Sequence, residues 1–278
     1  MSDTVGDTVG ERPWLEEAGR VTGSVAWIAI APVKALALLY LAEVELEPTG
    51  VRENRAFYLV DGEGRMVNGK VAGALVQVVP AYDAAAERLR LELPGGTAVE
   101  GVVEVGEQVT TDFFGRPVGG RVVTGPWAEA LSEIAGRPLR LVKADRPGSG
   151  VDRGAVGGVS LVGASSLGAL ATAAGLERVD GRRFRMLFGI DGVAAHAEDG
   201  WIGRRVRMGK AVVMPRGNVG RCAVTTQNPD TGVPDLDTLR VLGEYRAEVE
   251  TTEPRPFGVW GQVVEPGRVR VDDPVEPE

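Results

Sequence analysis

The chain has 278 residues, of which 44% are hydrophobic and 25% are charged, so it is long enough for two globular domains with ordinary cores. Its formal net charge of −8 argues against a nucleic-acid partner, because phosphate backbones are bound by basic surfaces. The single cysteine and the single histidine leave no internal disulfide, no four-thiolate iron–sulfur cluster, no histidine cluster for zinc and no Ser-His-Asp triad.

Targeting and membrane segments are not predicted. No run of eighteen apolar residues is present, and the acidic, polar start lacks the basic and apolar regions of a secretory signal. We therefore expect a cytoplasmic protein without a membrane partner. Residues 1–22 are expected to form a disordered acidic tail.

Short strands dominate the first part of the chain. Residues 23–30 are rich in β-branched and aromatic side chains and end before Pro32, a pattern that predicts a strand. Further short strands, separated by Gly/Pro turns, are predicted at 43–47, 51–61, 76–79, 89–93 and 102–105. Such spacing predicts a small β-barrel domain over 23–120, with a boundary near Gly119-Gly120.

Helices join the strands in the second part, 121–265. One helix is predicted over 126–136, ended by Gly136, and a second over 165–174, with Ser165 or Ser166 as its N-cap. Strands at 201–209 and 211–214, a short helix at 236–242, a last strand at 257–261 and an acidic tail at 266–278 complete the prediction. The fold class expected is mixed and β-rich, α+β, with two barrel domains and flanking helices.

Three blocks in the second part carry the clearest pattern. They are an arginine-aromatic-arginine block at 180–185, an acidic-Trp-Gly turn at 198–203, and an Arg-Cys block with Thr-Thr and Pro-Asp-x-Gly at 220–232. In this order and spacing they resemble the MOSC family, the molybdenum cofactor sulfurase C-terminal domain. Pro32-Val33-Lys34 and the segment around Arg55 resemble the N-terminal β-barrel domain that accompanies many MOSC domains.

The resemblance implies a molybdenum-molybdopterin cofactor whose metal is bound by the thiolate of Cys222, the catalytic position. A thiolate is a soft anionic ligand, and the neighbouring Arg221 is expected to lower the pKa of the thiol. The alternative is a buried structural cysteine, because free cysteine often packs as a small hydrophobe.

The same resemblance implies a set of cofactor-binding residues. Arginine suits the site because its planar fork donates several hydrogen bonds to phosphate, and a helix N-terminus suits an anion because its N–H groups are unpaired. The alternatives are a solvated lysine at a strand end, an exposed strand arginine and an ordinary capped helix. The implied residues are Lys34, Arg55, Ser165, Ser166, Arg183, Arg185, Gly220, Arg221 and Thr225.

Two positions depart from the family pattern. Ala35 stands where the family has a serine, and Met186-Leu187 stands where it has Pro-Asn. At two positions where polar donors are expected in the pocket, the side chains are therefore apolar. This difference affects whether the pocket binds the cofactor.

Resemblance to the two-domain, amidoxime-reducing members implies an oxidoreductase independent of pyridoxal phosphate. It would reduce N-hydroxylated substrates such as amidoximes or hydroxylamines, with electrons from a separate reductase or ferredoxin, since no flavin or cluster motif is present. The alternative is a non-redox MOSC protein: a cofactor carrier, a persulfide-handling protein or a divergent member using Cys222 for other chemistry. Molybdenum content distinguishes the two classes.

Overall fold

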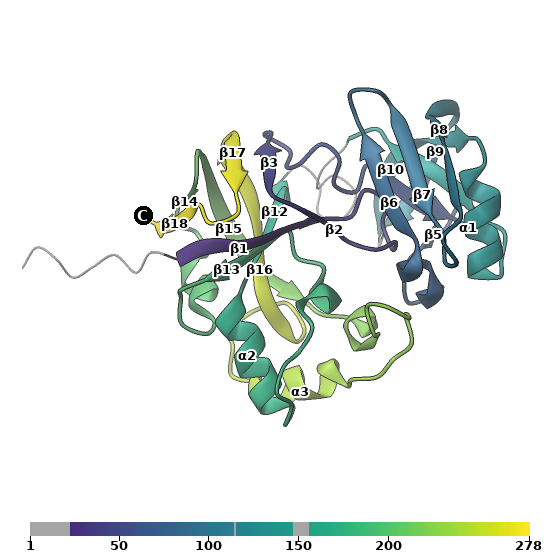
Figure 1. Ribbon diagram of the computed structural model, residues 1–278. Coiled ribbons are helices and arrows are strands. Elements are labelled where there is room, and N and C mark those ends of the chain that lie inside the picture. Colours follow the sequence, from purple (N-terminus) through teal and green to yellow (C-terminus); the bar gives the residue numbers. More distant parts are fainter. Residues whose placement is uncertain (1–22, 114, 147–155) are drawn as a thin grey trace, which may run out of the picture.

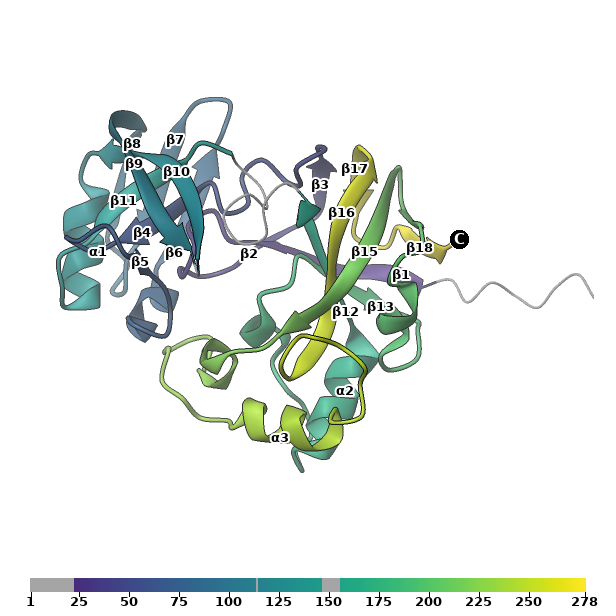
Figure 2. The same ribbon diagram turned by 180° about the vertical axis from the view of Figure 1, so that it is seen from behind.

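The computed structural model describes residues 23–113, 115–146 and 156–278, which form two units (Figure 1). The chain begins in the larger unit with β1 (Gly23–Ile30) and crosses to the smaller unit, which it builds from β4 (Phe57–Val60) to β11 (Arg140–Ala144). It then returns to the larger unit, as the reverse view shows (Figure 2). The connection after β1 thus lies between the units. The predicted tail at 1–22 lies outside the described residues.

The larger unit is a closed β-barrel. β1 pairs with both β18 and β13, which closes the sheet into a ring of seven described strands. β12 and β13 run parallel, as Leu161 opposite Phe188 shows, and the barrel encloses buried Val, Ile, Leu and Met side chains. In ring order after β1 the strands are β13 (Phe188–Asp191), β12 (Val159–Gly163), β16 (Pro256–Glu265), β15 (Ala211–Gly220), β14 (Val206–Met208) and β18 (Pro274–Pro277).

Short elements flank the barrel. β2 (Leu39–Leu41) extends the sheet beside β1, and β3 (Glu43–Leu46) pairs with β17 (Gly267–Arg270). Helices α2 (Ala164–Ala173) and α3 (Thr238–Tyr245) contact each other over a separate apolar cluster. The described 3₁₀ turns are η1 (Gly73–Gln77), η4 (Gly181–Phe184), η5 (Ala197–Trp201) and η6 (Ala223–Thr226).

The smaller unit packs two antiparallel sheets and a helix around its own core. α1 (Trp127–Ala135) covers this core with Trp127, whose indole N–H donates to the Leu89 carbonyl at 3.2 Å. Gly136 ends the helix in a left-handed conformation, as its position in the sequence predicts. The sheets comprise β5 (Met66–Val67), β4, β11, β10 (Arg116–Thr124) and β9 (Glu104–Phe113), and then β6 (Val79–Asp83), β7 (Arg88–Glu92) and β8 (Ala98–Val102).

The predicted fold class is confirmed, and so are the strands at 23–30 and 89–93 to within a residue. The strand predicted at 76–79 is wrong, because 73–77 form the 3₁₀ turn η1. Side chains three apart lie on one face of such a turn, and Leu75 and Val78 are both fully buried there. The predicted boundary at residue 120 falls inside β10, and the smaller unit continues through α1 and β11.

The acidic end of the chain is also folded. Residues 266–278 were expected to form a tail, but they contain β17 and β18, and the predicted last strand, β16, precedes both. Val269 and Val275 are fully buried, while the acidic side chains between and after them lie outside the core. Apolar residues facing inward from a mostly acidic segment explain why composition alone suggested a tail.

Candidate functional site

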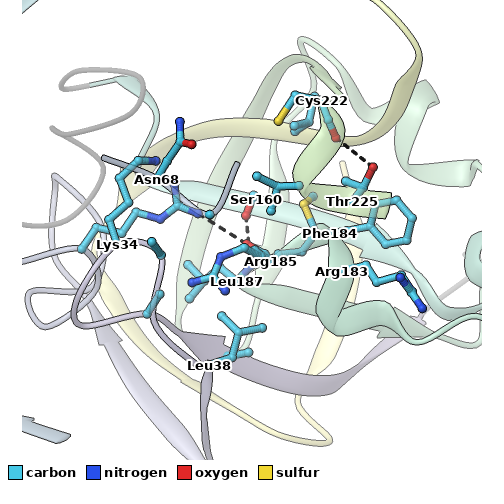
Figure 3. A pocket seen from close by; sticks show the side chains of 18 of the residues that line it. Lys34, Leu38, Asn68, Ser160, Arg183, Phe184, Arg185, Leu187, Cys222 and Thr225 are labelled. Carbon is cyan, nitrogen blue, oxygen red and sulfur yellow. Dashed lines mark hydrogen bonds between the residues drawn. The ribbon is translucent and has the colours of Figure 1, made fainter. Parts of the chain in front are cut away.

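A pocket of about 350 Å³ lies where the two units meet (Figure 3). This volume falls within the roughly 300–1,000 Å³ of small-molecule sites. Two groups of segments line it. We call residues 31–38, 54–55 and 68–70 the connecting wall, and residues 157–160, 183–187 and 219–227 the barrel wall, each contributing several lining side chains.

The pocket is strongly cationic although the chain is acidic. Three cations, Lys34, Arg55 and Lys70, line it from the connecting wall, and three, Arg183, Arg185 and Arg221, line it from the barrel wall. None of its described lining residues is Asp or Glu. Burial, followed by the charges of Arg55 and Arg185, holds the pKa of Lys34 well below its usual value. Burial also lowers the pKa of Arg185 to about 10, so this side chain remains a cation at neutral pH. An anionic ligand would relieve this crowding.

The connecting wall is held by backbone bonds around the end of β1. The Lys34 N–H donates to the Phe57 carbonyl at 2.8 Å, and the Arg55 N–H donates to the Ala31 carbonyl at 2.8 Å. Ala35 and Arg55 have φ of 81° and 56°, a left-handed conformation that disfavours residues with a Cβ. On the barrel wall Arg185 has φ of 53°. Three strained residues therefore lie around one pocket, which is typical of a binding site.

Cys222 lies at the end of β15 on the barrel wall. Its side chain is exposed and lines the pocket, so the alternative of a buried structural cysteine is wrong. The loop that carries it is tightly tied, because the Thr225 hydroxyl bonds the Cys222 carbonyl at 3.0 Å and the Thr238 hydroxyl at 2.7 Å. A Cβ at Gly220 would lie 2.4 Å from Glu253 Oε2 and 3.0 Å from Pro254 Cδ, so a larger residue there would require the Glu253 side chain to move.

Arg221 and Arg183 hold this loop through internal bonds. The Arg221 guanidinium is buried, donates to the carbonyls of Phe257 and Phe184 at 2.9 Å each, and lies 5.1 Å from the Phe184 ring. Arg183 forms an ion pair with Asp235 at 2.7 Å and donates to the Thr226 and Gln227 carbonyls at 3.2 and 2.7 Å. Both arginines border the pocket, yet these bonds give them a positioning role.

Ser165 and Ser166 are not among the residues that line the pocket. Ser165 is exposed, and the N-cap of α2 is Gly163 without a side-chain bond, so the predicted serine cap is wrong. The fully buried Ser166 hydroxyl donates to Glu198 Oε1 at 2.8 Å and accepts from the His196 N–H at 2.8 Å. Its role here is to join α2 to η5.

The remaining expected residues, Lys34, Arg55, Arg185, Gly220, Cys222 and Thr225, all line the pocket together with Ala35 and Leu187. Four uncharged polar side chains that were not predicted as site residues also line it: Asn54, Asn68, Ser160 and Gln227. Asn68 precedes a Gly-Lys pair in a turn pattern that could have drawn attention to it. Gln227 lies within the Cys222 block, whereas nothing distinguishes Ser160 before the barrel is known.

Within the described residues, no helix is long and apolar enough to cross a membrane. In the same part of the chain no three His, Cys, Asp or Glu side chains are grouped as a metal site.

Two known protein domains match successive parts of this chain. Residues 22–130 match the MOSC N-terminal beta barrel domain and residues 152–276 match the MOSC domain. The chain is 27% identical to mitochondrial amidoxime-reducing component 1 of Mus musculus, over 95% of this chain and 85% of that protein. It is 28% identical to the Xenopus laevis protein of the same name, over 91% of this chain and 81% of that protein.

Among solved structures, the YUAD protein of Bacillus subtilis is similar with a TM-score of 0.44 and 12% identity, over 93% of this chain and 96% of that chain. The family assignment depends instead on the two matched domains, which together span both structural units and contain Lys34, Arg55, Arg185 and Cys222. With a MOSC N-terminal β-barrel domain followed by a MOSC domain, the chain belongs to the MOSC family.

Proposed function

We propose that the pocket binds a molybdenum-molybdopterin cofactor and that the protein is an oxidoreductase that reduces N-hydroxylated substrates such as amidoximes or hydroxylamines. One observation carries this proposal: an exposed thiol and six cationic side chains line a single pocket whose described lining residues include no carboxylate. Such a donor set suits a ligand with a phosphate at one place and a thiophilic metal at another.

The residues present fit this group. Lys34, Arg55 and Arg185 would bind its phosphate, because each brings a cation to the same cavity and burial strengthens the charge interaction. Cys222 would bind the metal as a thiolate, and its loop is fixed by Thr225, Arg183 and Arg221, which lowers the cost of ordering the ligand. When bound, the cofactor supplies the two-electron redox chemistry that removes oxygen from the substrate.

The chain's own contribution is positioning and electrostatics. Electrons would come from a separate donor protein, a reductase or a ferredoxin. The names of the two vertebrate relatives support the substrate class, since both are called amidoxime-reducing components.

The exposed Cys222 favours a second candidate, a non-redox MOSC protein that carries the cofactor or handles sulfur as a persulfide. An accessible thiol is needed for sulfur transfer. The apolar residues at Ala35 and Leu187, which stand where the family has polar donors, also favour it.

Measuring the molybdenum content by elemental analysis distinguishes the two candidate functions. Protein produced in a host that makes molybdopterin should carry close to one molybdenum per chain and should reduce benzamidoxime when given a chemical or protein electron donor. Protein without metal under these conditions, but with a cyanolysable sulfur on Cys222, would instead support the persulfide candidate.

A further inference from the structure

The barrel wall lacks one polar donor that its family pattern calls for. Leu187 replaces an asparagine, and its side chain is only 3% exposed among the buried residues of the barrel. Its backbone N–H is already donated to the Ser160 hydroxyl at 3.0 Å. A ligand in the pocket therefore receives no amide donor from the side chain at this position.

Asn68 on the connecting wall presents such an amide. Its Oδ1 accepts from the Lys70 N–H at 2.9 Å, and its carbonyl accepts from the Val71 N–H at 2.9 Å, so a tight turn after β5 fixes the carboxamide. Within the described part of the chain its Nδ2 donates no hydrogen bond. Asn68 and Cys222 both line the pocket, and Figure 3 shows Asn68 beside Lys34 at the left of the view and Cys222 at its upper right.

The turn that carries Asn68 is docked on the loop that carries Cys222. The Gln227 side chain donates through Nε2 to the Gly69 carbonyl at 2.7 Å, across the junction of the two units. Nearby, a Cβ at Gly73 would lie 2.4 Å from the Gly232 carbonyl oxygen, so the two backbones are in close contact. Asn68 is thus held at a fixed position relative to the thiol.

We propose that Asn68 donates an Nδ2 hydrogen bond to an oxygen of the anion held in the pocket, so that the connecting wall supplies the amide that Leu187 does not. Lys34 and Arg55 line the same cavity, and no described lining residue is a carboxylate, so the acceptor is an anionic or strongly polar oxygen. That oxygen belongs either to the cofactor or to the N-hydroxylated substrate. This identification rests on the proposed function.

The hydrogen bond itself can be tested on cofactor-free protein with inorganic phosphate and molybdate as probes, by isothermal titration calorimetry. Asn68→Ala removes the donor without adding charge and should weaken the binding of at least one probe about tenfold, the cost of a hydrogen bond to a charged group. Asn68→Asp keeps the oxygen that accepts from Lys70 but replaces the donor with a negative charge, and should weaken binding further.

Asn228→Asp is the matched control. Asn228 also accepts a backbone N–H in a turn, from Asp230 at 2.8 Å, and its Nδ2 donates to Asp235 at 2.9 Å, but it is not among the pocket-lining residues. Asn228→Asp therefore adds a charge in a turn outside the pocket and should leave both affinities within about twofold. If Asn68→Asp alone weakens binding and Asn68→Ala does not, charge repulsion explains the effect and the proposed hydrogen bond is refuted. Thermal unfolding of each variant verifies that the pocket is still folded.

Two measurements on protein from a molybdopterin-competent host identify the oxygen. If it belongs to the cofactor, Asn68→Ala lowers the molybdenum content per chain. If it belongs to the substrate, molybdenum content stays normal and KM for benzamidoxime rises while kcat changes little. Unchanged values in both arms contradict the proposal. Wild-type protein without molybdenum would overturn the proposed function, whereas the phosphate and molybdate titrations would still decide the role of Asn68.

Discussion

The two walls of the pocket use their cations differently. On the barrel wall, Arg183 and Arg221 are bound to backbone carbonyls and to Asp235, and they fix the loop that carries Cys222. On the connecting wall, burial and then the charges of Arg55 and Arg185 lower the pKa of Lys34. The comparison teaches that Arg183 and Arg221 hold the loop of the thiol in place, whereas the connecting wall, together with Arg185, concentrates charge that a ligand can neutralise.

The largest expected effect belongs to the barrel wall. Cys222→Ser should reduce bound molybdenum to background and abolish molybdenum-dependent turnover, because a serine hydroxyl is a harder ligand that stays protonated near neutral pH. The fold should persist, because the side chain is exposed and nearly isosteric with serine, so the free energy of unfolding should change by about 0.5 kcal/mol or less. The three expectations can be checked on one preparation, by measuring its bound molybdenum, its turnover and its unfolding in urea. Normal molybdenum content in the variant would show that Cys222 is not the metal ligand.

Arg221→Met tests whether the barrel wall uses its arginines for positioning. The substitution leaves the Phe184 and Phe257 carbonyls without their buried donor, and we expect a loss of about 3 kcal/mol in the free energy of unfolding. Arg240→Met, on the exposed face of α3, is the control and should cost less than about 0.5 kcal/mol. Equal stability of the two variants would show that the Arg221 bonds do not support the loop.

Sequence patterns located the pocket residues better than they located the elements that carry them. Lys34, Arg55, Arg185 and Cys222 occur in local motifs, and their convergence at one pocket was expected from those motifs. The closure of the barrel by β1 and β18 was not expected, because pairing between the two ends of the chain leaves no local trace. The turn at Asn68 is visible in the sequence, but its position beside the Cys222 loop is not, since that position depends on the contact of Gln227 with Gly69 across the two units.

Ser166→Ala distinguishes a structural serine from a ligand-binding one. Removing the hydroxyl leaves the buried Glu198 carboxylate and the His196 N–H each with one partner fewer, so we expect a loss of about 2 kcal/mol in the free energy of unfolding. Molybdenum content per folded chain should not change, because the side chain does not line the pocket. Ser165→Ala, at an exposed neighbour on the same helix, should change neither quantity. A fall in molybdenum content for either variant would show that the start of α2 contributes to cofactor binding.

Lys34→Met probes the connecting wall and should change the free energy of unfolding less than Arg221→Met and Ser166→Ala do, and with the opposite sign. Burial and the charges of Arg55 and Arg185 hold the pKa of Lys34 below its value in the unfolded chain, so between those two pKa values the unfolded state binds more protons. The free energy of unfolding of the wild type therefore rises with pH across that window, and the penalty for the buried charge is complete below it.

Methionine removes this penalty. Cofactor-free Lys34→Met should be more stable than the wild type by about 1 kcal/mol at neutral pH, and the difference should shrink as pH approaches the ordinary lysine pKa of about 10.4. Urea unfolding of both proteins at several pH values measures this, with Lys210→Met at an exposed lysine as the control. The same variant should bind inorganic phosphate more weakly, because the connecting wall loses one of its cations. A variant that is less stable at every pH would show that the buried Lys34 side chain does not destabilise the cofactor-free protein, which would contradict the expected charge penalty.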